Sequence, residues 1–191
     1  MESSRVMLRP GGRTESNRKA VADAVLTLVT SGNVMFEAQD IADLAGVHRT
    51  TVRRRWPTRE ALLALAMEEH TARFTVDLTG DWKTVLRRIA FGLRDFMDDP
   101  VEDALNRVVA VSASPQFTDL VKRQWDRLIE AFAQPLLAAQ KKGRIAASAD
   151  IALALFAIAS SVLTQKVYAG RPMSDARLER LVRQTVRALT P

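Results

Sequence analysis

Apolar residues recur at helical spacing along almost the whole chain, and this pattern limits the possible folds more than any other feature. In the first expected helix, between Asn17 and Gly32, the positions i, i+3, i+4, i+7 and i+8 are apolar. These positions hold Val21, Ala24, Val25, Leu28 and Val29. Similar stripes recur in residues 85–97 and 178–189, and no stretch alternates with period two for long enough to indicate a strand. The sequence therefore predicts an all-α fold with about nine helices.

Charge and composition narrow the partners and exclude several kinds of chemistry. The net charge is +6 and the pI is about 10.3, which favours polyanionic partners, nucleic acid first and anionic membranes second. There is no cysteine, so disulfides, thiol catalysis and cysteine-bound zinc are excluded. The only histidines, His48 and His70, lack the spacing of a metal site or a catalytic triad, and the eight glycines form no phosphate-binding loop. We therefore expect no enzyme, no cofactor and no metal.

The sequence gives no sign of a membrane or export segment. Residues 1–19 contain no apolar core of signal-peptide length. The longest charge-free apolar run extends from Ile151 to Gln165 and is shorter than the roughly 20 residues that span a bilayer. We therefore expect a cytoplasmic protein with no membrane partner.

Three regions differ in pattern. Residues 1–16 combine proline, glycine and polar residues with Arg5, Arg9 and Arg13, and indicate a disordered basic arm. Such an arm is either a plain terminus or an element that contacts phosphates and the minor groove. We expect a smaller helical domain over residues 17–57, whose function the next motif indicates, and a larger helical domain over residues 58–191.

Residues 37–56 indicate two short helices joined by a tight turn. Gly46 can adopt the positive φ that the turn needs, and the small side chain of Ala42 suits a close helix crossing. Ile41, Val47 and Val52 lie where apolar side chains would hold the two helices together. The arrangement is a helix-turn-helix, whose second helix can enter the major groove of DNA.

Basic residues concentrate on this unit, with five arginines and no acid between Gly46 and Arg59. Residues at the start of the second helix are expected to face base edges: His48, Arg49, Thr50 and Thr51. Residues expected near phosphates are Lys19, Arg53, Arg54, Arg55, Thr58 and Arg59, with Thr58 and Arg59 at a helix N-terminus. Either Arg54 or Arg55 is expected to point away from DNA, because consecutive helical residues diverge by about 100°. His48 is equally compatible with a solvent position. Trp56 fits packing between helices better than base stacking.

The string "DIADLAGVHRTTVRRRWPTREALL", residues 40–63, resembles the signature of the TetR/AcrR family of transcriptional regulators. The signature joins a helix-turn-helix to an aromatic-Pro-Ser/Thr-Lys/Arg-Glu element, here Trp56 to Glu60. The resemblance implies a homodimer with an N-terminal DNA-binding domain and a C-terminal domain that binds a small ligand and dimerises. Arg53 stands where the family commonly has a phosphate-contacting tyrosine, so contact to a phosphate or to a guanine edge are both open. The second helix also lacks the usual Ser/Thr cap, since Phe36 and Glu37 stand there.

The C-terminal half is expected to hold a pocket for a small, largely apolar effector, because few of its charges look buried. The aromatic residues expected to face inward are Phe91, Phe96, Trp125, Phe132 and Phe156. For each of them, simple core packing is the alternative. The helix over residues 150–168 is apolar almost all round and the helix over 175–189 has one apolar face. We expect these two helices to pack against their copies in a homodimer.

Together these features predict a dimeric, sequence-specific DNA-binding regulator that reads a pseudo-palindromic double-stranded operator. The expected mode is repression relieved by a small molecule of unknown identity. The alternative is an activator, or a ligand-independent DNA-binding protein of the same fold. A membrane-surface protein is a weaker reading, because the arginines cluster in one short unit and not along a helix face.

Overall fold

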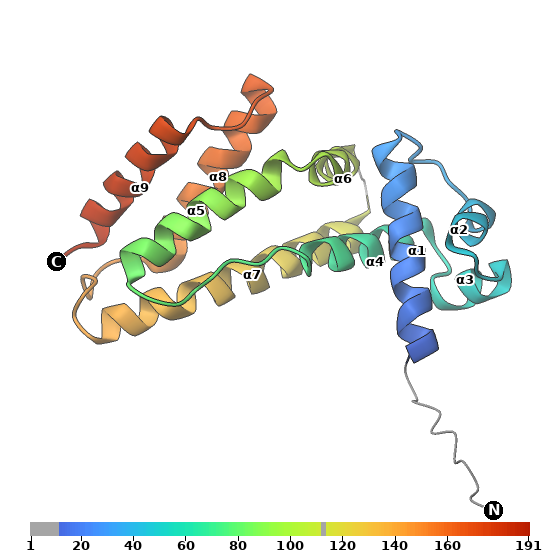
Figure 1. Ribbon diagram of the computed structural model, residues 1–191, viewed down its shortest axis with the longest axis horizontal. Helices are drawn as coiled ribbons and strands as arrows, with labels where there is room; N and C mark the ends of the chain where they lie inside the picture. Colours follow the sequence, from blue (N-terminus) through green and yellow to red (C-terminus); the bar gives the residue numbers. More distant parts are fainter. Residues whose placement is uncertain (1–11, 112–113) are drawn as a thin grey trace, which may run out of the picture. The chain divides into compact units, whose positions relative to one another are not determined.

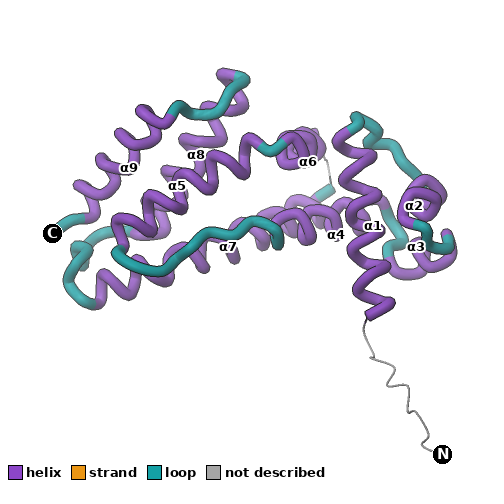
Figure 2. The backbone as a smooth tube through the Cα atoms, in the orientation of Figure 1, coloured by secondary structure: helices purple, strands orange, loops and turns teal. Residues whose placement is uncertain are grey.

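The computed structural model describes residues 12–111 and 114–191, and these contain nine α-helices and no strand (Figures 1 and 2). The helices are α1 (Gly12–Thr30), α2 (Ala38–Ala45), α3 (Arg49–Arg55), α4 (Arg59–Thr71), α5 (Trp82–Asp98), α6 (Pro100–Val111), α7 (Pro115–Lys141), α8 (Ile151–Ala169) and α9 (Asp175–Leu189). The all-α prediction is confirmed for this part of the chain.

Contacts divide the chain into two compact units, the first ending at Glu69 and the second running from His70 to Pro191. The division falls later than the boundary after residue 57 that the sequence suggests. Most of α4 belongs to the first unit, where the guanidinium of Arg18 in α1 pairs with the carboxylates of Glu68 and Glu69. These ion pairs join α4 to α1 within the first unit.

Helix α1 begins earlier than expected. The sequence suggested disorder through residue 16, but the helix begins at Gly12, so that expectation is wrong for residues 12–16. Glu15 lies in the first turn, where a negative charge stabilises the helix N-terminus. The hydroxyl of Thr14 also accepts a hydrogen bond from Arg55 Nη2 at 3.4 Å. The remainder of the expected basic arm, residues 1–11, lies outside the described residues.

Helix α2 has an N-terminal cap although serine and threonine are absent there. Asp40 Oδ2 accepts a hydrogen bond from the backbone N–H of Glu37 at 2.8 Å, which is the pairing of a capping box. An aspartate three residues into the helix thus supports an N-terminus that has no serine or threonine cap. The side chain of Phe36, directly before the cap, is buried.

Helix α5 lies at the centre of the second unit. It packs against α6, α7, α8 and α9, and α8 also packs against α7 and α9 (Figure 1). Aliphatic side chains of these helices and of the turn after α7 make up the fully buried core: Leu86, Ile89, Leu93, Leu136, Ile145, Leu155, Ile158 and Leu178. The apolar stripe predicted in residues 85–97 is the face of α5 that supplies this core.

The connection between α4 and α5 is extended, without forming a strand (Figure 2). Phe74, Val76 and Leu78 pack against the core while the residues between them are exposed. Gly92 of α5 makes room for this segment, since an added Cβ would lie 3.0 Å from Val76 Cγ2 and 3.4 Å from a ring carbon of Phe74. Hydrogen bonds from the hydroxyl and the backbone N–H of Thr79, with Arg88 nearby, lower the pKa of Asp77 in the same segment.

Helix α8 is long and apolar enough to cross a membrane by length and composition alone, which the charge-free run had not suggested. That run ends before Lys166, but the helix continues through this single charge to Ala169. Core helices of other proteins pass the same test. One face of α8, including Leu155 and Ile158, is buried against its own chain, whereas Leu153 and Phe156 are 62% and 61% exposed. Much of the apolar surface of α8 therefore lacks a cover within one chain.

Candidate nucleic-acid interface

The turn between α2 and α3 is built on one glycine. Gly46 has φ 64° and ψ 32°, the left-handed conformation that ends many helices. Its backbone N–H and that of Val47, at 3.1 Å, both donate to the carbonyl oxygen of Ala42. An added Cβ at Gly46 would meet no atom within 4 Å, so the requirement for glycine comes from the backbone alone.

An apolar contact fixes the two helices on either side of this turn. Ile41 and Ala42 of α2 and Val52 of α3 are buried, and Val47 is half-buried. Val52 is the only buried residue of α3. The rest of α3 is therefore available to a partner.

The four residues predicted to face base edges lie at the start of α3. His48 is the N-cap, and its carbonyl accepts the backbone N–H groups of Thr51 and Val52 at 2.8 and 3.2 Å. The side chains of His48, Arg49 and Thr50 are exposed, and Thr51 is half-buried. The structure thus brings these residues together on the surface, and their contact with DNA stays a prediction.

The residues predicted near phosphates divide into free and engaged side chains. Lys19, Arg53 and Arg54 are exposed, and among the described residues neither of these two arginines forms an ion pair. Arg55 differs, because it reaches α1 and donates to the hydroxyl of Thr14. The side chains of Arg53 and Arg54 therefore lie open to solvent, and their contact with DNA stays a prediction.

Thr58 and Arg59 open α4 as the sequence suggested, but Arg59 has an additional role. Thr58 Oγ1 accepts the backbone N–H of Ala61 at 3.1 Å and so caps the helix. Arg59 is half-buried, and its Nη1 donates to the carbonyl of Val34 at 3.4 Å and lies 2.8 Å from Met35 Sδ. Arg59 therefore braces the loop before α2, a contact across more than twenty residues that local sequence patterns do not reveal.

Arg18 is a structural residue of this unit that sequence reasoning missed. Its guanidinium contacts the carboxylate of Glu68 at 2.9 Å and that of Glu69 more closely. Glu69 is only 8% exposed, so it needs this partner. The pairing fixes α1 against α4.

In the second unit, Phe96 and Phe132 belong to an aromatic cluster in which Phe132 is buried and Phe96 is half-buried. Phe74 stacks on Phe96 with ring centroids 4.5 Å apart and meets Phe132 edge-on at 5.9 Å, while His70 stacks on Phe96 at 5.0 Å. His70 Nε2 lies 3.3 Å from a carboxylate oxygen of Glu102, and both side chains are almost fully buried. The cluster thus combines apolar walls with one polar pair, which no sequence pattern had indicated.

The five aromatic residues predicted to face inward do not converge on one pocket. Phe91 is half-buried beside the guanidiniums of Arg87 and Arg94, 4.3 and 4.9 Å from its ring centre. The expectation for Phe156 is wrong, because its side chain points outward from α8. Its neighbour Leu155 faces the core, and consecutive helical residues diverge by about 100°. Phe156 and Trp125 instead line a surface groove between α7 and α8, with a volume of about 1060 Å³.

Comparison with known proteins decides the family. A profile described as the C-terminal domain of tetracyclin repressor-like proteins matches residues 76–185, more than half of the chain. The chain belongs to the TetR family. TetR-family regulators are non-enzymatic transcription factors, and the protein is accordingly a DNA-binding transcriptional regulator.

Individual relatives agree with this assignment. The chain is 28% identical to the DNA-binding transcriptional repressor TetR of Mycobacteroides abscessus, over 85% of this chain and 87% of the relative. It is 29% identical to the HTH-type transcriptional regulator AqdR of Rhodococcus erythropolis, over 76% and 72%. The crystal structure of a TetR transcriptional regulator from Agrobacterium tumefaciens superposes with a TM-score of 0.73, covering 92% and 94% of the chains at 22% identity. At that identity the last comparison supports the TetR fold alone.

Proposed function

We propose that the protein is a homodimeric transcriptional repressor that binds a pseudo-palindromic operator through α3 of each protomer and is released by a small, largely apolar ligand. The observation that carries the proposal is the exposure of α3. Val52 alone is buried, while His48, Arg49 and Thr50 stand free at the N-terminal turn. A helix fixed on one side and uncovered at its N-terminus suits the major groove.

Within this proposal the polar residues of the first unit have different tasks. Arg49 reads a guanine edge with two hydrogen bonds, and Thr50 and Thr51 contact neighbouring bases. Arg53 and Arg54 contact phosphates, because neither has an acidic partner among the described residues. The N-terminus of α4 after Thr58, and Lys19, add weaker phosphate contacts.

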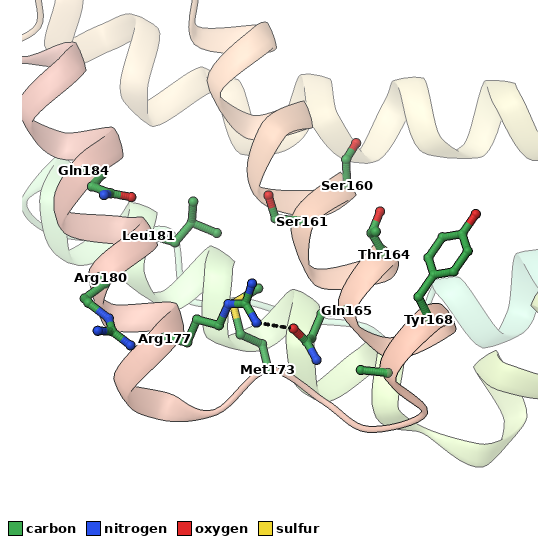
Figure 3. Close-up of a pocket in the computed structure, with 11 residues that line it drawn as sticks. Ser160, Ser161, Thr164, Gln165, Tyr168, Met173, Arg177, Arg180, Leu181 and Gln184 are labelled. Carbon is green, nitrogen blue, oxygen red and sulfur yellow. Dashed lines mark hydrogen bonds between the residues drawn. The ribbon is translucent and has the colours of Figure 1, made fainter.

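The homodimer is supported by the uncovered faces of α8 and α9. A groove of about 880 Å³ lies between them, lined by side chains that Figure 3 shows on both helices. Arg177 Nη1 donates to Gln165 Oε1 at 2.7 Å across this groove. A second copy packed on this surface would remove the exposed apolar residues of α8 from water, and this burial stabilises the dimer. Apolar residues covered in this way need no membrane, so the proposed protein is cytoplasmic.

The effector site is proposed beside the aromatic cluster of Phe74, Phe96 and Phe132. These rings favour an apolar ligand, and the buried pair of His70 and Glu102 offers polar groups that can orient it. To release DNA, the ligand must bind the DNA-incompetent form of the dimer more tightly than the DNA-competent form.

Selection of bound fragments from a random DNA pool tests the proposal with the purified full chain. We expect enriched sequences with two inverted half-sites whose centres are about one duplex turn apart, roughly 10–10.5 base pairs. Sedimentation on the selected duplex gives the number of chains bound. The proposal fails if the protein binds no duplex at low ionic strength. A promoter reporter then separates repression from activation by the sign of the response.

A further inference from the structure

The groove between α7 and α8 has an apolar floor and a charged rim. The floor residues include Trp125, Ile129, Leu153, Phe156 and Leu163. The rim holds three acids, Asp126, Glu130 and Asp150, and one base, Lys122. Among the described residues, the ion pairs include neither Asp126 nor Glu130, and both side chains are exposed. The groove therefore presents uncompensated carboxylates beside aromatic rings.

Helix α9 carries the opposite charge on its outer surface. Four exposed arginines follow one another at helical spacing: Arg177, Arg180, Arg183 and Arg187. The two acids of the helix are already engaged within the chain, Asp175 with Arg94 and Glu179 with Arg87. In the part of the chain that the structure describes, none of the four arginines has an acidic partner.

The groove is continuous with the surface proposed for dimerisation. Leu153 lines both this groove and a smaller one between α8 and α9, and Ser160 lines both this groove and the one in Figure 3. Its length also suits α9. The floor follows α7 from Lys122 to Leu137, about 24 Å at 1.5 Å per residue, and the 15 residues of α9 span about 22.5 Å.

In a two-fold symmetric dimer, α9 can pack either against α9 of the second copy or against its α7–α8 groove, and the charges favour the groove. Packing α9 against the α9 of the second copy would bring eight exposed arginines together, and like charges in an interface cost several kcal/mol. Packing α9 over the α7–α8 groove of the second copy pairs unlike charges. Because the interface is isologous, this contact forms twice in each dimer.

We propose that the α7–α8 groove binds α9 of the second copy of the chain, with Arg180 and Arg187 facing Asp126 and Glu130. Arg180 and Arg187 are seven residues apart and so lie on one stripe of α9. Their aliphatic stems cover the apolar floor, while their guanidiniums stack on Trp125 and reach the acidic rim. The inference rests on the proposed homodimer and adds α7 to its interface.

Charge exchange in the full chain tests this contact, with the dimer dissociation constant measured by analytical ultracentrifugation. Arg180→Glu with Arg187→Glu is compared with Asp126→Arg with Glu130→Arg, and with the chain that carries all four changes. We expect each double reversal to raise the dissociation constant about 10-fold or more, and the fourfold variant to return to within about 3-fold of wild type. Lys142→Glu with Arg144→Glu, two reversals at exposed positions that line none of the described grooves, should change it by less than about 3-fold.

Cross-linking gives a second readout that does not depend on affinity. Since the chain has no cysteine, an introduced thiol is the only one present. Co-expressed Glu130→Cys and Arg180→Cys chains should form a covalent heterodimer with a short bismaleimide, whereas Arg180→Cys alone should not cross-link. Efficient cross-linking of Arg180→Cys alone would place α9 against α9 and overturn the inference.

The two levels of proposal fail in different ways. The contact between α9 and the α7–α8 groove is wrong, and the homodimer stands, in either of two cases. In the first, the Arg180 and Arg187 reversals leave the dimer dissociation constant unchanged. In the second, the fourfold variant dimerises no more tightly than the weaker double variant. A wild-type chain that stays monomeric at concentrations where it binds its selected duplex removes both.

Discussion

Replacement of Gly46 by alanine isolates the backbone requirement of the turn between α2 and α3. The residue has φ 64° and ψ 32°, and a Cβ there would contact nothing within 4 Å, so no steric clash contributes. An L-residue in this conformation costs about 1–2 kcal/mol. We therefore expect Gly46→Ala to lower the free energy of unfolding of the first unit by that amount. Gly46→Asn should cost less, because asparagine tolerates the left-handed region, and Gly46→Val should cost most.

Urea unfolding measures this cost if the signal comes from the first unit. Trp56 lies in that unit, so a chain in which Trp82 and Trp125 are replaced by phenylalanine reports it by fluorescence. Two glycines serve as controls. Gly32 also has positive φ, 86°, with no atom near its Cβ, so Gly32→Ala should cost a similar amount, whereas Gly12→Ala should be neutral. A Gly46→Ala chain as stable as wild type, or one more stable than Gly46→Asn, would refute the reasoning.

Three further changes test other contacts. Arg49→Ala should reduce discrimination between the correct and a wrong base pair by about 1–3 kcal/mol at one position of the selected duplex. Arg54→Ala should weaken binding to all duplexes alike and reduce the slope of log affinity against log salt concentration by about one. Equal effects of both changes on selected and random DNA would contradict this division. Glu69→Ala should lower the free energy of unfolding by about 1.5–3 kcal/mol, because it removes a buried, charged hydrogen bond from Arg18 and leaves the guanidinium half-paired. Glu68→Ala should cost at most about 1 kcal/mol, because the Glu68 side chain is 55% exposed. Urea midpoints that rank the two acids in the opposite order would contradict this reasoning. Phe132→Ala should destabilise the second unit by about 3–5 kcal/mol, since the ring is 3% exposed. Urea unfolding followed by the fluorescence of Trp82 and Trp125, which lie in the second unit, in a chain with Trp56 replaced by phenylalanine measures this loss, and a loss below about 1 kcal/mol would show that the ring is not part of the core.

Local patterns explain why the helices and the DNA-binding turn could be predicted. The stripe from Val21 to Val29 and the Gly46 turn both involve residues close in sequence, and their spacing alone indicates a buried face or a positive φ. The Thr58 cap of α4 is equally local. For these elements tertiary structure confirmed what neighbouring residues had already specified.

Contacts between distant residues could not be predicted in this way. The sequence indicates Arg59 as a phosphate ligand, but its guanidinium also donates to the carbonyl of Val34 in the loop before α2. The partner of Glu69 is Arg18, fifty-one positions away. The alternation of Phe74, Val76 and Leu78 was visible in the sequence. It is too short to indicate a strand, and only packing against α5 shows its meaning.

Helix α8 shows the limit of periodicity most clearly. When apolar residues surround a helix, the pattern defines no inward face, and so the sequence could not tell that Leu155 points to the core and Phe156 to the surface. Composition alone is equally compatible with a buried helix, a membrane span and a helix at an interface. The structure removes the first reading, because Leu153 and Phe156 stay exposed in the single chain. Acidic side chains on the neighbouring α7 and arginines on α9 fit a protein partner better than lipid, since hydrocarbon offers no counter-charge to either.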